Sequence, residues 1–253
     1  MPLLHGAEPY QHDGGPVGVL LCHGFTGCPQ SLRPWAEYLA EAGMTVSLPR
    51  LPGHGTSWRE LNLTQWEDWY SEIERSFTDL TGRCEIVVVA GLSMGGALAL
   101  RLAQQHPAEV AGLVLVNPSV LSADRRLRLL PVARHVLGSL PGIASDIKKP
   151  GTAELAYDRT PLRALFSLTR FWSLVQQDMG LVRAPLLLFR STVDHVVEPA
   201  SSAFVLDHVS SEHVEERLLT DSYHVATLDN DAPTIFAGSL TFIQTLTPAP
   251  AEG

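Results

Sequence analysis

The sequence predicts an α/β fold, with a mostly parallel, doubly wound sheet and a small inserted helical cap. Its 253 residues fit a single large domain of this class. Short apolar runs recur along the chain, and segments with helical periodicity lie between most of them, which is the pattern of βαβ units. Most of the runs are apolar on both faces, as expected for strands of a parallel sheet that is covered by helices on both sides. One interval of about seventy residues interrupts the alternation.

The expected strands and helices alternate in chain order. The expected strands are Val17–Cys22, Met44–Leu48, Ile86–Ala90, Leu113–Val116, Leu186–Phe189 and Val214–Leu219. The expected helices are Ser31–Glu41, Gln65–Leu80, Met94–Gln105, Ala200–Val209 and Pro233–Leu246.

The interruption divides the chain into a core and an insertion. We expect residues 1–117 and 185–247 to form the core, residues 118–184 to form a helical cap without a clear strand, and residues 248–253 to be a flexible tail. Within the cap, one helical face carries Leu162, Leu165, Phe166, Thr169 and Trp172.

The cap also differs from the core in charge. It holds ten basic and five acidic residues, a net +5, whereas the rest of the chain carries −14. Two interpretations stay open: an ordinary solvated surface, or a surface that approaches anionic surfaces or lipid aggregates.

Composition excludes several classes of function. A net charge of −9 disfavours binding of a polyanion such as nucleic acid over the whole surface. Three cysteines do not fit a disulfide framework, and their spacing is not that of a zinc site. The N-terminus lacks the basic and apolar regions of a secretory signal, and no apolar run reaches the roughly 18 residues of a membrane span. We expect a cytoplasmic protein without metal, cofactor or stable membrane insertion. The sequence implies no particular oligomeric state.

A candidate nucleophile lies between an expected strand and an expected helix. Gly91, Ser93 and Gly95 form a Gly-x-Ser-x-Gly motif directly after the run at residues 86–90. In this context the serine occupies a tight, strained turn that exposes its hydroxyl at the carboxyl end of the sheet. The next backbone N–H, that of Met94, then lies at a helix N-terminus, where negative charge is favoured.

The loop at residues 23–27 follows the first strand and is the candidate oxyanion site. Acyl transfer develops a negative oxygen, which needs two aligned N–H donors, each worth about 3 kcal/mol. We expect Met94 to supply one and Phe25 the other, with Gly24 allowing the backbone to approach the substrate. His23 is interpreted as a buried structural histidine.

A serine nucleophile needs a general base, and the base needs an orienting carboxylate. In this type of fold the chain order is serine, acid, histidine. Asp194 follows the run at 186–193 and His224 follows the run at 214–219, so both occupy loops after strands. Asn117, after the preceding strand, holds a position where some hydrolases place the acid, but an amide cannot ionise. Less suitable positions are held by the rival residues Asp178, Asp207, Asp221, His195, His208 and His213.

Five stretches together resemble the α/β-hydrolase fold, and more narrowly the small bacterial carboxylesterases and monoacylglycerol lipases. The stretches are residues 23–27 (HGFTG), 51–56 (LPGHGT), 91–96 (GLSMGG), Asp194 with Pro199, and 224–229 (HVATLD). The resemblance implies a triad of Ser93, Asp194 and His224, and an oxyanion site at Phe25 and Met94.

The sequence therefore predicts a serine carboxylic-ester hydrolase that acts on short- to medium-chain acyl esters, including monoacylglycerols. Besides Gly24, the expected substrate-binding residues are apolar cap side chains, which could instead be cap core: Leu165, Phe166, Phe171, Trp172 and Met179. A thioesterase or acyltransferase would use the same triad. Carbon–carbon bond hydrolysis and a non-enzymatic small-molecule receptor on the same scaffold are further alternatives.

Overall fold

The computed structural model describes residues 1–143 and 145–247; the tail expected at 248–253 lies outside the described residues. In the described chain, seven strands form one sheet in the order β1-β3-β2-β4-β5-β8-β9, and only β1 runs antiparallel to its neighbour. The strands of this sheet are β1 (Tyr10–His12), β2 (Val17–Cys22), β3 (Thr45–Leu48), β4 (Ile86–Leu92), β5 (Val110–Val116), β8 (Leu186–Ser191) and β9 (Val214–Leu219).

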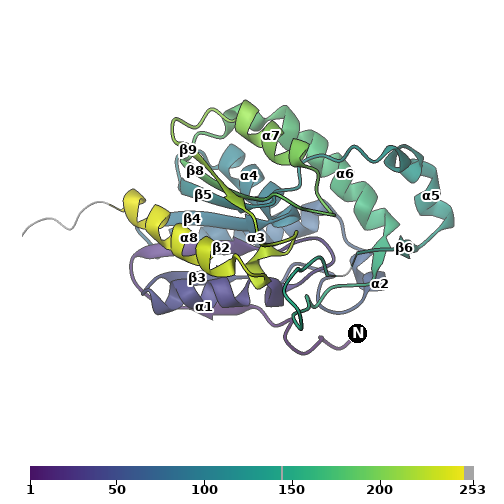
Figure 1. Ribbon diagram of the computed structural model, residues 1–253, viewed down its shortest axis with the longest axis horizontal. Helices are drawn as coiled ribbons and strands as arrows, with labels where there is room; N and C mark the ends of the chain where they lie inside the picture. Colours follow the sequence, from purple (N-terminus) through teal and green to yellow (C-terminus); the bar gives the residue numbers. More distant parts are fainter. Residues whose placement is uncertain (144, 248–253) are drawn as a thin grey trace, which may run out of the picture.

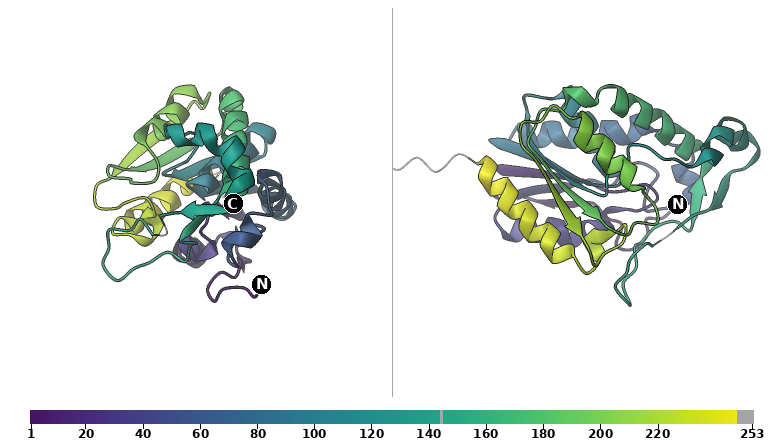
Figure 2. Two further views of the ribbon diagram at one scale, coloured as in Figure 1. Left: turned by 90° about the vertical axis from the view of Figure 1, so that its right-hand side faces the viewer. Right: turned by 45° about the horizontal axis from the view of Figure 1, so that its top comes forward.

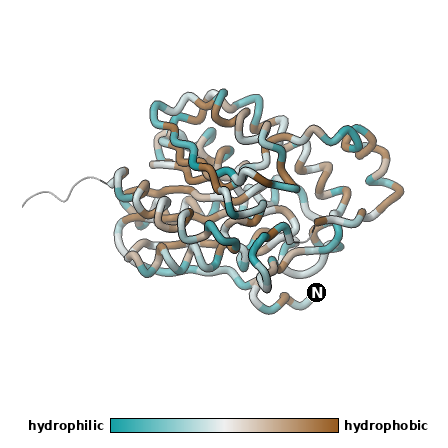
Figure 3. The backbone as a smooth tube through the Cα atoms, in the orientation of Figure 1, coloured by the Kyte–Doolittle hydropathy of each residue, from teal (hydrophilic) through white to brown (hydrophobic). Residues whose placement is uncertain are grey.

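Helices cover both faces of the sheet (Figures 1 and 2). One face is packed by α1 (Arg33–Glu41) and α8 (Ala232–Leu246). The other is packed by α3 (Trp66–Thr81), α4 (Met94–Gln105) and α7 (Pro199–His208). The sheet therefore separates two hydrophobic clusters, and hydrophobic residues follow its central strands in Figure 3. The predicted doubly wound, mostly parallel architecture is confirmed.

The segment between β5 and β8, residues 118–184, is called the insertion below. Its described part contains η2 (Arg125–Leu129), α5 (Leu130–Val136), β6 (Ser139–Pro141), β7 (Arg159–Pro161), α6 (Leu162–Gln177) and η3 (Met179–Leu181). Because β6 and β7 pair as an antiparallel two-stranded sheet, the expectation that this interval lacks strands is wrong. Each strand is only three residues long and has no alternating pattern that a sequence could reveal.

The helix α6 joins the insertion to the core. Its most buried residues include Ala164, Leu168, Phe171 and Val175, which belong to the same hydrophobic cluster as α3 and α4. This buried face is rotated from the face expected at Leu162, Leu165, Phe166, Thr169 and Trp172, of which Leu165, Phe166 and Thr169 are only half-buried. The rotation arises because α6 packs on two core helices along one side and borders a cavity along another.

The far end of the insertion is much less covered. In α5, Val132 is 72% exposed and Val136 is 79% exposed. Figure 1 shows α5 and β6 at the end of the molecule, away from the sheet, with α6 leading back to the core. None of the described helices is long and apolar enough to cross a bilayer.

Candidate active site

Ser93 connects the end of β4 to the start of α4 in a strained conformation. Its φ of 56° and ψ of −119° lie in a region that non-glycine residues rarely adopt. The Ser93 N–H donates to the carbonyl of Val116 at 3.0 Å, and its carbonyl accepts from Ser119 N–H at 3.0 Å. The end of β5 and the loop that follows it therefore fix the strained residue from both sides.

The glycines of the motif allow backbone segments to approach one another. A Cβ atom built on Gly95 would lie 1.8 Å from the carbonyl oxygen of Cys22, at the end of β2. A Cβ on Gly91 would lie 2.3 Å from the carbonyl oxygen of Gly95. Both distances are far below contact distance, so this turn can form only with glycine at both positions.

Asp194 and His224 meet at the carboxyl ends of β8 and β9. His224 Nδ1 is 2.8 Å from Asp194 Oδ2, and both side chains are less than 10% exposed, at 7% and 6%. The other oxygen, Oδ1, accepts the N–H groups of Val196 and Val197, each at 2.8 Å. Burial opposes ionisation of Asp194, but the hydrogen bond and charge of His224 and the two N–H groups outweigh it, so its pKa lies below the ordinary value. A carboxylate in this state orients the imidazole.

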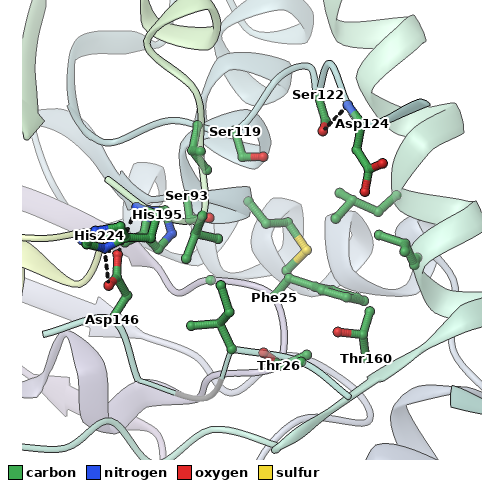
Figure 4. A pocket seen from close by; sticks show the side chains of 18 of the residues that line it. Phe25, Thr26, Ser93, Ser119, Ser122, Asp124, Asp146, Thr160, His195 and His224 are labelled. Atoms are coloured by element: carbon green, nitrogen blue, oxygen red, sulfur yellow. Dashed lines mark hydrogen bonds and ion pairs between the residues drawn. The ribbon is translucent and has the colours of Figure 1, made fainter. Parts of the chain in front are cut away.

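Ser93 and His224 line the same cavity, which has a volume of about 460 Å³. Figure 4 shows the side chain of His224 beside Ser93. Among the hydrogen bonds of the described residues, none joins Ser93 Oγ to His224, and such bonds often tighten only when substrate binds. The structure thus brings all three predicted triad residues to one place, and their catalytic roles stay a prediction.

The two expected oxyanion donors, Phe25 and Met94, also border this cavity. Met94 is the first residue of α4, so its N–H has no partner within the helix. Neither this N–H nor that of Phe25 is bonded to an acceptor in the described chain. Both donors are therefore available to a bound oxygen.

Two buried histidines support the loop that carries Phe25. His23 Nε2 accepts the N–H of Leu51 at 3.2 Å, and its Nδ1 lies 3.0 Å from the carbonyl of Gly24. Its ring meets that of His54 edge-on at 5.0 Å. The pKa of His23 is lowered to about 4, mainly by burial; the bond to Gly24 opposes this shift, and the nearby Arg50 adds to it. The ring is consequently neutral at pH 7 and acts as a fixed hydrogen-bonding bridge.

The predicted substrate-binding residues separate into two groups. Gly24, Leu165 and Trp172 line the cavity. Three others are placed elsewhere: Phe166 lies under the guanidinium of Arg134 on the outer side of α6, Phe171 stacks on Trp66, and Met179 is buried in the core. These three face away from the cavity because they lie on different sides of α6 or beyond its end.

Asn117 has a role that the sequence did not indicate. Its Nδ2 donates to the carbonyl of His224 at 2.8 Å and to Ser191 Oγ at 3.0 Å, and its Oδ1 accepts the N–H of Ser191 at 2.8 Å. The amide thus links the ends of β5 and β8 to the backbone of the predicted base. The sequence signal available was the position directly after a buried strand.

Three acidic residues of the insertion also line the cavity, Asp124, Asp146 and Glu154, and sequence reasoning missed all three. Burial raises the pKa of Glu154 to about 7, opposed by the charge of His224 and the hydroxyl of Ser31. Asp146 is 8% exposed and lies beside His195 and His224 (Figure 4). No cluster of three or more His, Cys, Asp or Glu side chains suited to a metal ion occurs within residues 1–143 and 145–247.

The chain is similar to known esterases and lipases. It is 43% identical over 245 residues to a thermostable monoacylglycerol lipase of Bacillus sp. (strain H-257), covering 95% of this chain and 96% of that protein. It is 26% identical over 247 residues to a carboxylesterase of Bacillus subtilis (strain 168), covering 94% and 97%. A structure solved in work on LipS and LipT, two metagenome-derived lipolytic enzymes, superposes with a TM-score of 0.94 at 40% identity, covering 96% of this chain and all of that one.

Residues 17–231 match the family described as serine aminopeptidase, S33 (Hydrolase_4). A more distant neighbour, a Paleococcus ferrophilus monoacylglycerol lipase, shares the fold with a TM-score of 0.78 at 19% identity, covering 95% of this chain and all of that one. The family match at residues 17–231 extends over most of the chain and includes the turn at Ser93 as well as the loops of Asp194 and His224. The chain therefore belongs to the serine aminopeptidase S33 (Hydrolase_4) family of serine hydrolases and has the α/β-hydrolase fold.

Proposed function

We propose that the protein hydrolyses carboxylic esters of short- to medium-chain acyl groups, including monoacylglycerols. The observation that carries this proposal is the buried pair of Asp194 and His224 at the cavity that also holds Ser93. The strained turn at Ser93 and the two available N–H donors supply the remaining parts of an acyl-transfer site. The relatives named as monoacylglycerol lipase and carboxylesterase support the substrate class.

The geometry supports a two-step reaction. His224 accepts the hydroxyl proton of Ser93 as Ser93 attacks the ester carbonyl, while Asp194 stabilises the imidazolium that forms. The N–H groups of Phe25 and Met94 bind the oxyanion. His224 then protonates the departing alcohol. In the second step His224 activates a water molecule, which releases the acid and regenerates Ser93.

The cavity offers separate surroundings for the two parts of such an ester. Leu127, Leu165, Leu168 and Trp172 form an apolar wall suited to an acyl chain. Thr26 and Glu154 add hydrogen-bonding groups that could bind the hydroxyls of a glycerol moiety. With a pKa raised to about 7, the Glu154 carboxyl can accept or donate a hydrogen bond near neutral pH.

Two further aspects belong to the proposal. We assign residues 118–184 the role of a cap, because the insertion contributes one side of the cavity. We also infer a cytoplasmic location from its three unpaired cysteines, of which Cys22 and Cys28 are buried.

The test is hydrolysis of p-nitrophenyl esters from C2 to C16, and of monoacylglycerols, by the wild type and by Ser93→Ala. We expect wild-type turnover to favour short and medium chains and kcat to fall at least about 10⁴-fold in the variant. Ser119→Ala is the matched control, because Ser119 lines the same cavity and has no assigned chemistry. Full activity in Ser93→Ala would refute the triad. Tight ligand binding without turnover would indicate a receptor, and preferred turnover of acyl thioesters would indicate a thioesterase.

A further inference from the structure

The insertion contributes a buried carboxylate to the catalytic end of the molecule. Asp146 belongs to the loop between β6 and β7, is 8% exposed, and borders the cavity. It lies far along the chain from both Asp194 and His224, at sequence separations of 48 and 78 residues. Figure 4 shows its carboxyl group directed toward His195 and His224.

This single carboxyl group binds the two loops that hold the predicted acid and base. Asp146 Oδ2 accepts the N–H of His195 at 3.1 Å and the N–H of His224 at 3.2 Å. Its Oδ1 lies 2.8 Å from Nδ1 of the His195 ring, which makes the contact with that residue bidentate. His195 directly follows Asp194 in the chain. One side chain of the insertion thus bridges the backbone next to the acid and the backbone of the base.

Neighbouring contacts hold Asp146 in this place. Its carbonyl accepts the N–H of Val225 at 3.1 Å. Asp229 accepts the N–H groups of Lys148 and Lys149 at 2.7 and 2.8 Å, and it also accepts the N–H of Tyr223 at 2.9 Å. Residues 146–149 are therefore docked along the loop that carries His224, from one side of the histidine to the other.

Only an acceptor can make these contacts. A carboxylate with two oxygens accepts from two backbone N–H groups and from the ring N–H at the same time. An asparagine at this position can still turn its oxygen to the two backbone N–H groups and its NH₂ to the His195 ring, but it loses the negative charge, and hydrogen bonds to an ionised group are about twice as strong as those to a neutral one. Weaker bonds at this position would hold the acid and base loops together less firmly.

We infer that Asp146 is a positioning residue that sets the distance between the acid and the base, so that the insertion is part of the catalytic machinery. This inference rests on the proposed ester hydrolysis. It predicts that loss of the carboxylate slows turnover while leaving substrate affinity nearly unchanged, because Asp146 acts through the orientation of His224. A displacement of about 1 Å at the reacting groups can slow a reaction about 100-fold.

The experiment compares Asp146→Asn with Asp158→Asn on a p-nitrophenyl ester. Asp158 is an exposed acid of the same insertion, so its variant controls for the loss of one charge. For Asp146→Asn we expect kcat to fall about 10-fold and KM to stay within about twofold. For Asp158→Asn we expect both constants to stay within about twofold. Thermal unfolding and circular dichroism measure whether each variant is folded.

A second variant keeps the inference testable if Asp146→Asn does not fold. His195→Ala removes the ring contact but keeps the backbone N–H, so we expect kcat to fall about threefold; because His195 also borders the cavity, kcat alone is compared for this variant. A folded Asp146→Asn with wild-type kcat, or a loss confined to KM, would overturn the inference. If Asp146→Asn does not fold, an unchanged kcat in His195→Ala would overturn it.

Failure of the proposed function has a different signature. In that case the wild type hydrolyses no ester, or Ser93→Ala keeps full activity, before any variant of Asp146 is considered. Titration of Ser93 with a fluorophosphonate gives the fraction of reactive sites in each protein. If both the wild type and Asp146→Asn titrate fully, a difference in kcat reflects positioning and not a loss of folded protein.

Discussion

The two sides of the cavity are built differently. On the core side, backbone groups from β2, β4 and α4 meet directly at Gly91 and Gly95, and the nucleophile lies on this support. On the insertion side, the wall consists of side chains such as Leu165 and the 58% exposed Ile143. The comparison indicates that the placement of the nucleophile depends on close backbone packing, whereas the fit of the substrate depends on replaceable side chains of the lining.

The insertion itself shows a similar contrast between its two ends. Residues 146–149 are docked to the loop of His224 by hydrogen bonds to Val225 and Asp229. At the other end, α5 exposes Val132 and Val136. We expect substitutions to have effects in this order: large at the core side of the cavity, moderate at its lining, and small at α5.

Gly95→Ala is expected to have the largest effect. The added methyl group would overlap the carbonyl of Cys22, so β2 and α4 would have to separate. We expect loss of esterase activity and destabilisation by more than about 3 kcal/mol, measured by urea denaturation. Gly180→Ala is the control, because its Cβ would meet nothing closer than 3.9 Å and should change stability by less than about 0.5 kcal/mol. Wild-type activity in Gly95→Ala would contradict the conclusion that the turn at Ser93 has no room for a methyl group.

His23→Asn tests whether the buried histidine on the core side stays neutral, by the pH dependence of the stability of the fold. The unfolded chain binds a proton at this histidine below about pH 6.5, whereas the folded protein does so only near pH 4. The neutral buried ring therefore stabilises the fold fully above about pH 6.5, and this contribution falls by about 3 kcal/mol as the pH drops to about 4. Urea denaturation between pH 4 and 7.5 should give a flatter profile for the variant. Parallel profiles would show that His23 does not titrate as expected.

Leu165→Ala and Phe166→Ala compare a side chain that lines the cavity with a neighbour that does not. Both residues are half-buried and adjacent on α6, but only Leu165 borders the cavity. We expect Leu165→Ala to lower kcat/KM for a dodecanoyl ester about tenfold relative to an acetyl ester. Phe166→Ala should leave this ratio unchanged. Equal shifts in both variants would show that the ratio reports general loosening of the helix.

Val136→Ser is expected to have the smallest effect. The side chain is 79% exposed, so its removal from the surface changes little buried area. Stability should change by less than about 0.5 kcal/mol, and kcat/KM for a water-soluble acetyl ester should be unchanged. A clear loss of either would mean that α5 packs against another part of the protein in solution.

The sequence predicted those helices and strands that have a recognisable pattern within their own segment. The structure gives β2 and α4 the bounds that were expected, because turn residues bracket a clear apolar or helical pattern. The three-residue strand β1 was missed because it is defined by its pairing with β3 and not by a pattern of its own. The bridging contacts of Asp146 and Asn117 were missed because they join segments 49 to 107 residues apart.

The close packing of Gly91 and Gly95 at the turn of Ser93 has a consequence for protein engineering. A mutant library that randomises residues 91–96 would consist almost entirely of inactive clones, since two of these positions accept only glycine. A library directed at Leu127, Ile143 and Leu165 would vary the acyl-binding wall while leaving the reacting groups on their support. New substrate preferences should therefore be sought in the insertion, and natural divergence of such enzymes should follow the same route.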